Sequence, residues 1–526
     1  MKIQNFYPTK GHFLPEETAT FNLVMHLKQQ EKVSLQLDIF HLAERIFTKN
    51  WLLELNEGEQ IIPLTWTPPA EVNRGYGIKV RLLDQENMQT LHTAFSAFDV
   101  LLDWVDFPRY GFLSDFNPQR PDPKNTLKQL LPFHINGLQF YDWQYRHDKL
   151  VPENDLFIDP LGRKLSLTIT KQLIKYAHDF GMAAMPYLAV YAASIDFWRN
   201  HQDWGLFDEQ GKAHTFEDFL GLMDPSPGSP WTKHLLDECL NVTNELAFDG
   251  YHVDQYGEPK QAFNINKEEV DIPLSFVEFI QQLKNQSDNR PVVFNAVKNW
   301  PIDALADSKQ DFMYIEVWPP TPTYEDLREI VLGARQKSGN KPVVIAQYLH
   351  NDQIANIRLS NAVIMSCGGT RIELGEQSRL LSDPYFPKHE SISADLQTVL
   401  LRSSDFAVRY EELNGPKAEH INLQDIHIPD NVMAIGRKSE NFKTINLINF
   451  SNLTDPKWTE THSAPESKQN MQIKLPFTNQ VKQVYWASPD SNNSKMQPCP
   501  FHFHDNQLRI DVPILNFWTM IAIELT

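Results

Sequence analysis

Cysteine is scarce in this chain of 526 residues: there are three, Cys239, Cys367 and Cys499, far apart in the sequence. An odd number of widely spaced cysteines supports neither a disulfide framework nor a CxxC metal site. Long apolar stretches are missing too, so no segment is expected to cross a bilayer. The first residues, MKIQNFYPTKGHF, show no apolar core of a signal peptide. We therefore expect a cytoplasmic protein if the chain is full length, and a secreted one if a signal peptide has been trimmed.

Positive charge is also in short supply. Lys and Arg number 48 against 67 Asp and Glu, which gives a formal net charge of −19, and no local run of Lys or Arg opposes it. The negative electrostatic field of such a protein repels nucleic acids and anionic membranes, so neither is expected as a partner. A neutral substrate is easier to accept than a phosphorylated one. The sequence carries no indication of the oligomeric state.

Several familiar catalytic motifs are absent. No GxGxxG or GxxxxGK[ST] follows an early strand, which argues against a dinucleotide or nucleotide site. There is no GxSxG for a nucleophilic serine and no HExxH or comparable spacing for zinc. We interpret His134, His147 and His252 as separate hydrogen-bonding residues, and we expect neither a metal nor a cofactor.

The two ends of the chain show β-patterning. Val33, Leu35, Leu37 and Ile39 alternate with polar residues, the period-two pattern of a half-buried strand. Together with runs beginning at Phe21 and Gly77, this pattern predicts a small β-sandwich over residues 1–105. The same pattern returns after residue 425, and it predicts a C-terminal β-sandwich over residues 425–526. Its candidate strands are 432–435, 445–450, 481–487, 508–512 and 521–525.

The central region, residues 106–413, alternates short apolar strands with helical segments. In one such segment Leu235, Cys239, Val242 and Leu246 form a single apolar stripe. Eight strand–helix alternations predict a parallel (β/α)8 TIM barrel, with a doubly wound open sheet as the alternative. The candidate strands are 110–116, 135–141, 183–190, 251–254, 292–296, 312–317, 343–347 and 363–367.

Two of these strands end in a carboxylate beside aromatic residues. The fourth ends at Asp254, in HVDQY, and the sixth at Glu316, in YIEVW. Barrel enzymes carry their catalytic groups at the C-terminal ends of strands, and glycosidic cleavage needs two carboxyl groups that face the bond. Capping of the next helix or pairing with an Arg is the structural alternative for each. Glu258, Asp311 and Glu373 remain rival candidates.

The second strand ends in a cluster of polar and aromatic residues, QFYDWQYRH. It offers Asp142, Trp143 and His147 to the same rim, where hexose hydroxyl groups require polar partners and the sugar face requires an aromatic ring. Packing of a long loop is the alternative role for these side chains. The segments after the second and third strands, residues 142–163 and 192–230, are long and aromatic, which suits a groove for a polymer.

In these motifs the chain resembles glycoside hydrolase family 66, the dextranases and cycloisomaltooligosaccharide glucanotransferases. The resemblance covers most of the central region, in the family's order. It rests on RYGF from Arg109, HIN from His134, QFYDW from Gln139, RH at 146–147, YLAVYAA from Tyr187, FDG from Phe248, FNAV from Phe294, SCGGTRIELG from Ser366 and YFP from Tyr385. The residues around Asp254 depart from the family's usual pattern, and no inserted carbohydrate-binding module is apparent.

The resemblance implies a retaining glycosidase with Asp254 as nucleophile and Glu316 as acid/base. It also implies an immunoglobulin-like N-terminal domain and an antiparallel C-terminal β-domain around the barrel. We expect the substrate to be bound by residues of the matching motifs and their neighbours: Tyr141, Asp142, Trp143, His147, Tyr187, Tyr191, Gln255, Tyr256, Asn295, Trp318 and Glu373.

The leading hypothesis is a hydrolase that cleaves α-1,6-glucosidic bonds of dextran or isomaltooligosaccharides, with that glucan as its partner. A transglycosylase that forms cyclic or longer isomaltooligosaccharides is the first alternative, since only the acceptor differs. A non-catalytic glucan-binding protein and a metal-dependent barrel hydrolase are the others.

Overall fold

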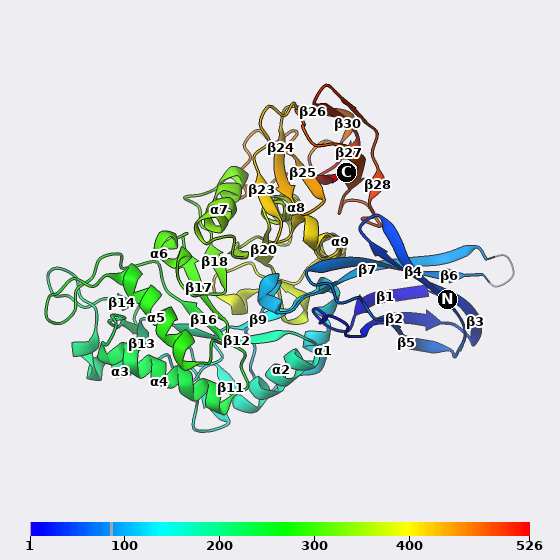
Figure 1. The fold of residues 1–526 in the computed structure, drawn as a ribbon. Helices are drawn as coiled ribbons and strands as arrows, with labels where there is room; N and C mark the ends of the chain where they lie inside the picture. Colours follow the sequence, from blue (N-terminus) through cyan, green and yellow to red (C-terminus); the bar gives the residue numbers. More distant parts are fainter. Residues whose placement is uncertain (1, 85–87) are drawn as a thin grey trace.

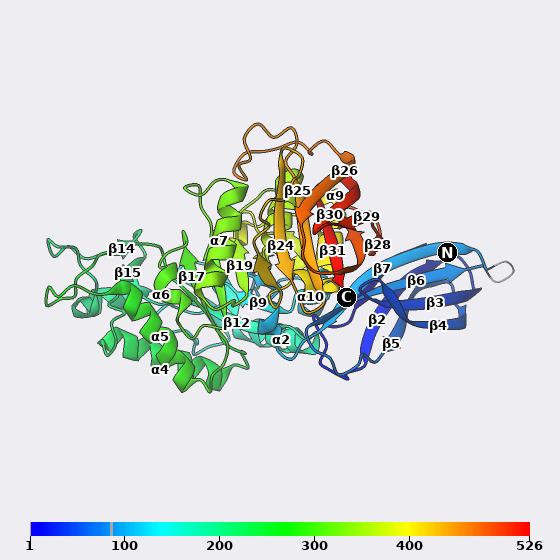
Figure 2. The same cartoon turned by 45° about the horizontal axis from the view of Figure 1, so that its top comes forward.

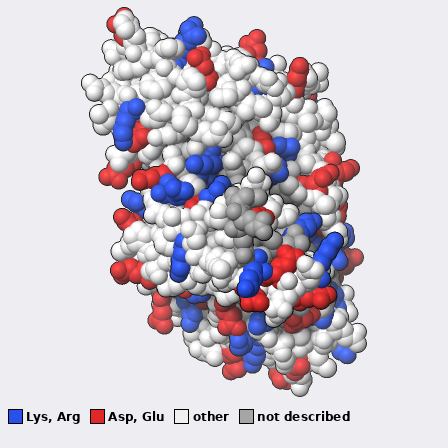
Figure 3. Space-filling model, turned by 90° about the vertical axis from the view of Figure 1, so that its right-hand side faces the viewer, with Lys and Arg blue, Asp and Glu red and all other residues white. Residues whose placement is uncertain are grey.

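The computed structural model describes residues 2–84 and 88–526 as a multidomain protein, in which β-rich regions flank a central parallel sheet with its helices (Figure 1). In Figures 1 and 2 the N-terminal strands lie at one end of the molecule, and the small sheet of β13 (Ala192–Ser194), β14 (Thr215–Phe216) and β15 (Leu220–Leu222) lies at the other. No helix among the described residues is long and apolar enough to cross a membrane. On the face shown in Figure 3, basic and acidic side chains are interspersed.

The N-terminal strands form two antiparallel sheets, with the orders β1-β2-β5 and β4-β3-β6-β7. Alternate residues of β2 and β3, among them Phe21, Leu23, Leu35 and Leu37, are buried in one core between them. The three strands expected from the sequence fall in β2, β3 and β6. The strands are β1 (Lys2–Pro8), β2 (Ala19–Leu27), β3 (Glu31–His41), β4 (Glu44–Leu55), β5 (Gly58–Trp66), β6 (Arg74–Leu83) and β7 (Thr90–Val100).

A ten-stranded sheet fills the centre of the chain, in the order β20-β19-β18-β17-β16-β12-β9-β8-β21-β22. From β20 to β21 each strand runs parallel to its neighbour. Only Glu373 separates β20 from β21, so residues 369–375 pair with β19 at one end of the array and with β8 at the other. The strands are β8 (Tyr110–Leu113), β9 (Gly137–Phe140), β12 (Ala183–Ala189), β16 (Tyr251–Asp254), β17 (Val292–Val297), β18 (Phe312–Glu316), β19 (Val343–Ala346), β20 (Gly369–Ile372), β21 (Leu374–Gly375) and β22 (Arg379–Leu380).

Seven of the eight strands expected in this region overlap observed strands, and the eighth is wrong. Residues 363–367 lie in the last turn and C-cap of α8 (Ile354–Ser366), and the strand is β20 instead. Helix α8 packs on α7 and α9 and also on β24 and β25 of the C-terminal region. Because it is covered on nearly every side, its apolar residues occur without helical spacing, and such a run cannot be told from a buried strand.

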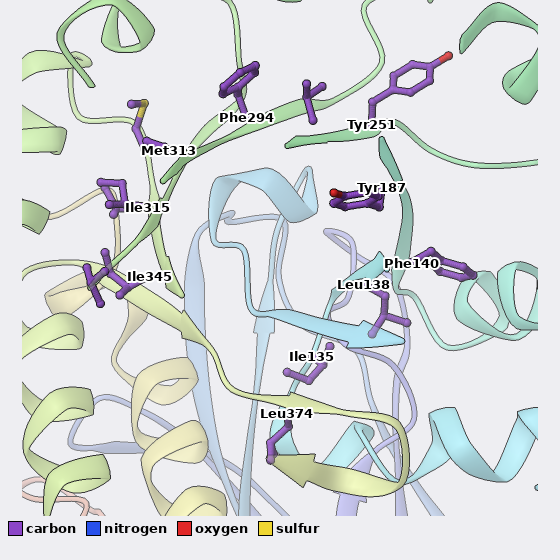
Figure 4. Packing of buried hydrophobic residues seen from close by; sticks show 14 of the residues in the cluster. Ile135, Leu138, Phe140, Tyr187, Tyr251, Phe294, Met313, Ile315, Ile345 and Leu374 are labelled. Atoms are coloured by element: carbon purple, nitrogen blue, oxygen red, sulfur yellow. The ribbon is translucent and has the colours of Figure 1, made fainter. Parts of the chain in front are cut away.

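Side chains along the parallel strands alternate between two packing layers, as the period of two requires. One set, which includes Phe294, Met313, Ile315 and Ile345, packs with the helices (Figure 4). The other set, which includes Tyr110, Val293, Phe312, Tyr314 and Val344, forms a separate cluster inside the curl of the sheet. The helices are α1 (Pro123–Lys128), α2 (Leu167–Asp179), α3 (Ile195–Asn200), α4 (Pro230–Glu245), α5 (Ile272–Gln286), α6 (Ile302–Ala306), α7 (Tyr324–Lys337), α8, α9 (Ala394–Arg409) and α10 (Glu411–Asn414).

The C-terminal strands again form two antiparallel sheets, β23-β24-β25-β31-β27-β28 and β26-β30-β29. Ile445, Leu447, Ile473 and Ile510 are buried between them. The strands are β23 (Glu419–Ile421), β24 (Val432–Lys438), β25 (Phe442–Asn449), β26 (Lys468–Pro476), β27 (Val481–Ala487), β28 (Gln497–Pro498), β29 (Phe501–His504), β30 (Gln507–Leu515) and β31 (Trp518–Leu525).

A buried ion pair ties the N-terminal region to the first parallel strand. Arg109 donates from Nη1 to Asp99 Oδ2 (2.6 Å) and from Nη2 to Asp99 Oδ1 (3.0 Å). The same guanidinium also donates to the carbonyls of His134 (2.6 Å) and Gly11 (2.7 Å). Both charged side chains are almost fully buried, so each depends on the other for its stabilisation.

We expect Asp99→Ala to lower the free energy of unfolding by about 3 kcal/mol or more, because Arg109 is left as an uncompensated buried charge. The matched control is Asp179→Ala, which removes an exposed partner of Lys175 and should change stability by less than about 0.5 kcal/mol. Scanning calorimetry of both variants measures the difference. Equal unfolding temperatures would contradict the role given to the Asp99–Arg109 pair.

Candidate active site

The two candidate carboxylates are placed by the register of three neighbouring parallel strands. Asp254 is the last residue of β16 and Glu316 the last residue of β18, and β17 lies between them. Asn295 of β17 is opposite Tyr314, and Val297 is opposite Glu316. Since Val293, Phe312 and Tyr314 lie inside the curl of the sheet, the period of two directs Asn295 and Glu316 to that inner side as well.

A single amide group joins the two carboxylates. Asn295 Nδ2 donates to Asp254 Oδ1 (2.8 Å) and to Glu316 Oε2 (2.9 Å). The distance between these two carboxylate oxygens therefore cannot exceed the combined length of the two hydrogen bonds. The other oxygen of Glu316 accepts a hydrogen bond from the Tyr348 hydroxyl (2.9 Å), and the Gln255 backbone N–H donates to Asp254 Oδ1 (2.8 Å).

Burial raises the pKa of both acids. Desolvation, assisted by the neighbouring charge of Glu316, raises the pKa of Asp254 to about 7, against the opposing hydrogen bonds from Asn295, the Gln255 backbone and Tyr187. Desolvation also raises the pKa of Glu316, which the hydrogen bonds from Asn295 and Tyr348 oppose. Because two like charges so close together are unfavourable, the pair retains one proton near neutral pH. One acid and one base then face the same space.

A cavity of about 520 Å³ lies beside the pair. Tyr187, whose hydrogen bond lowers the pKa of Asp254, lines it together with Tyr256 and Tyr141. The rings of Tyr141 and Tyr187 are 5.2 Å apart, and Phe216 stacks on Tyr256 at 4.2 Å. Aromatic faces of this kind are suited to the apolar faces of sugar rings.

A polar network forms another part of the cavity wall. Arg163 donates from Nε to Asp159 Oδ2 (2.7 Å) and from Nη2 to Asp142 Oδ2 (3.4 Å). Desolvation raises the pKa of Asp142 to about 6, although Arg163 opposes the shift. His147 also lines the cavity, and its burial lowers the pKa of the imidazole to about 4, so the ring is neutral at physiological pH.

Of the residues expected at the site, Tyr141, Asp142, His147, Tyr187 and Tyr256 line the cavity. Asp254, Asn295 and Glu316 form the carboxylate pair and its bridge. Trp318 packs near Tyr348, with ring centroids 5.9 Å apart.

Four other expected residues do not reach the cavity in this structure. Trp143 is fully buried, packs on Phe248 and donates to the Tyr187 carbonyl (3.2 Å). Tyr191 and Gln255 are also buried and hold the chain after β16: the Tyr191 hydroxyl donates to the Glu258 carbonyl (2.8 Å) and Gln255 Nε2 to the Asn295 carbonyl (3.2 Å).

The fourth, Glu373, follows Ile372, which belongs to the inner cluster, so the alternation of the strand turns Glu373 outward. There it pairs with Arg371 and accepts a hydrogen bond from Asn361 of α8 (3.2 Å).

Of the other rival acids, Asp311 precedes β18, at the opposite end from Glu316, and pairs with Lys284 (2.8 Å). Glu258 is exposed. Within the described residues no group of three His, Cys, Asp or Glu side chains gathers to hold a metal ion.

Sequence reasoning missed Tyr348, Arg163, Phe216 and Tyr385. Tyr348 comes two residues after β19, so its place just beyond a strand end was a usable signal. The other three come from distant segments of the chain, and only the folded structure brings them together. Tyr385 lines the cavity and packs edge-to-face on Tyr141, with ring centroids 6.3 Å apart. The next residue, Phe386, stacks on Tyr141 with ring centroids 4.4 Å apart.

The chain is similar to known proteins over almost its whole length. The family model for glycosyl hydrolase family 66 matches residues 8–522. A cycloisomaltooligosaccharide glucanotransferase from Niallia circulans is 22% identical, over 93% of this chain and 68% of that protein. A dextranase from Streptococcus salivarius is 21% identical, over 94% of this chain and 73% of that protein.

Solved structures share the fold. The crystal structure of a Paenibacillus sp. cycloisomaltooligosaccharide glucanotransferase, complexed with cycloisomaltoheptaose, superposes with a TM-score of 0.91 at 20% identity and covers 99% of both chains. A maltogenic α-amylase from Thermotoga neapolitana gives 0.53 at 13% identity, over 81% of this chain and all of that one. Because the family model covers nearly every residue, this chain belongs to glycosyl hydrolase family 66.

Proposed function

We propose that this protein is a retaining glycoside hydrolase that cleaves α-1,6-glucosidic bonds of dextran or isomaltooligosaccharides. Its relatives include a dextranase and cycloisomaltooligosaccharide glucanotransferases. The observation that carries the retaining mechanism is the Asn295 bridge. Its two hydrogen bonds, 2.8 and 2.9 Å, hold one oxygen of Asp254 and one of Glu316 closer together than the separation of about 6.5 to 9.5 Å of inverting enzymes, which supports the shorter separation of about 5 to 5.5 Å typical of retaining ones.

The proposal includes the architecture. The eight parallel strands and their helices form a (β/α)8 barrel over residues 106–413, with the carboxylates at its C-terminal rim. The joining of β19 and β8 through residues 369–375 supports closure of the barrel. An immunoglobulin-like sandwich over residues 1–105 and an antiparallel β-domain over residues 425–526 flank it.

In the proposed reaction Asp254 attacks the anomeric carbon while Glu316 donates a proton to the departing glycosidic oxygen. Three hydrogen bonds to Asp254, from Asn295, the Gln255 backbone and Tyr187, stabilise its ionised form. The positive charge that develops at the anomeric carbon stabilises it further and leaves the shared proton with Glu316. Glu316 then removes a proton from water, which displaces Asp254 from the glucosyl-enzyme with net retention.

Transglycosylation is a second candidate, since relatives of this chain are glucanotransferases. It uses the same glucosyl-enzyme, with a sugar hydroxyl in place of water.

The first test is incubation with dextran and with isomaltotetraose, with products separated by size. Linear isomaltooligosaccharides are expected if water is the acceptor. Cyclic or lengthened products would assign the transferase activity instead. Binding without any product would show a non-catalytic glucan-binding protein and contradict the proposal. Full loss of turnover on chelation would point to a metal-dependent hydrolase.

The roles of the two acids are tested by substitution. We expect Glu316→Gln to lower kcat about 10² to 10⁴-fold, because the leaving oxygen loses its proton donor, and Asp254→Asn to lower it at least as much. Azide should restore turnover to Glu316→Ala as a glycosyl azide of retained configuration, and to Asp254→Ala as one of inverted configuration. The exposed rival Glu258 gives the control, since Glu258→Gln should keep full activity. Activity lost in Glu258→Gln but kept in Asp254→Asn would overturn the assignment.

The raised pKa of Asp254 also predicts a pH dependence of stability. The folded state binds the Asp254 proton more tightly than the unfolded state, so folding is weakened as the pH rises from the unfolded pKa towards about 7. Asp254→Asn removes this penalty. Its unfolding temperature, relative to that of the unmodified protein, should therefore be higher at pH 8 than at pH 5 by a few degrees. The same pH trend in Glu258→Gln would instead attribute the effect to net charge.

A further inference from the structure

The loops that follow β12 and β16 form an extension at the end of the molecule where β13 and β14 lie (Figure 1). Both loops leave the C-terminal ends of their strands, the rim that carries Asp254. Within the extension Phe207 pairs with Ala213 on one side and with Phe263 on the other, and Phe263 pairs in turn with Glu269. Four short antiparallel segments therefore lie side by side.

Two aromatic rings lie next to each other on one face of these segments. The backbones of Phe207 and Phe263 exchange two hydrogen bonds of 2.8 Å, and residues opposite each other in such a pair carry their side chains on the same face. Leu206 and Ala262, the residues before them, are fully buried. Within the described residues neither ring is part of a hydrophobic core or packed against one, so both half-buried rings face away from the interior.

The two rings line a cleft of about 350 Å³. Ile265, which is 52% exposed, adds an apolar side chain to them. A sugar unit offers apolar ring faces for such a surface, and its hydroxyl groups donate to carboxylates and accept from amide and ammonium groups. The cleft provides each of these partners, through Asp208, Glu209, Asn264 and Lys267.

The cleft and the cavity lie on opposite faces of the extension. Phe216 lines the cavity. Along residues 213–216 the period of two puts Ala213 and Thr215 on one face and Phe216 on the other, and Ala213 lies opposite Phe207. A short oligosaccharide can therefore fill only one of the two places. A long α-1,6-glucan can reach both, because the C5–C6 bond in each linkage adds a rotatable bond to the chain.

Resting on the proposed function, we propose that the cleft of Phe207 and Phe263 is a second binding site for α-1,6-glucan. It holds one part of a polymer while another part of the same chain lies at Asp254 and Glu316. Two contacts with one chain raise the effective concentration of the polymer at the cavity, so this site favours long dextran over short oligosaccharides.

The test is the double substitution Phe207→Leu with Phe263→Leu, which keeps apolar side chains but removes the flat rings. The KM for dextran should rise at least about fivefold with kcat unchanged, because binding outside the reacting centre is lost. The kcat/KM for isomaltotetraose should stay as in the unmodified protein, which also shows that the variant is folded. Should the double variant fail to cleave the tetraose, Phe263→Leu alone provides the same comparison.

Phe503→Leu is the matched control. Phe503 is a partly exposed phenylalanine on β29 in the C-terminal region, far from the extension in the sequence. Its substitution should change the kinetics on neither substrate.

Electrophoresis in native gels that contain dextran measures binding without turnover. Retardation of the Asp254→Asn protein should become weaker when the two leucine substitutions are added. Unchanged retardation and an unchanged KM for dextran, or equal losses on dextran and isomaltotetraose, would overturn the second site while leaving the hydrolase assignment intact. Loss of a dimer in solution with unchanged dextran binding would assign the rings to contact between copies of this chain, and would overturn it too. No turnover of any glucan by the unmodified protein would instead reject the proposed function, whereas the gel still shows whether the cleft binds dextran.

Discussion

The site depends on the register of three parallel strands, β16, β17 and β18. Asp254 and Glu316 end the outer two strands, and Asn295 on the middle strand is directed to the same inner side. A shift of one residue in β17 would turn Asn295 outward and place Ala296 or Phe294 between the acids. The amide that now donates to both carboxylates would then be lost, and two buried acids would face each other without a common partner.

This arrangement is unfavourable for folding, and the surrounding structure compensates for it. Burial raises the pKa of Asp254 and of Glu316, which means that the folded protein disfavours their ionised forms. The same desolvation leaves one proton on the pair near neutral pH, which acid/base chemistry requires. A large core between strands and helices supplies the stabilisation that offsets the penalty.

The aromatic residues near the site fall into two groups, those buried in the scaffold and those that line the cavity. Trp143 and Tyr191 are buried and hold the backbone near the site, whereas Tyr141, Tyr187 and Tyr256 line the cavity. The loops after β9 and β12 supply further residues of its wall, among them Asp159 and Phe216. Buried strands that fix the catalytic groups, with longer loops that shape the pocket, are a common division in parallel α/β enzymes.

The sequence by itself determined the strand–helix alternation, the two flanking β-regions and the two strand ends that carry Asp254 and Glu316. These features follow from local periodicity and from carboxylates at the ends of apolar runs. The eighth strand could not be placed, because α8 is covered on almost all sides and its apolar residues lose helical spacing. The outward direction of Glu373, the Asn295 bridge, the hydrogen bond from Tyr348 and the meeting of Arg163, Phe216 and Tyr385 were decided only by the tertiary structure. Each depends on strand register or on contacts between segments far apart in the chain, which no local pattern of residues records.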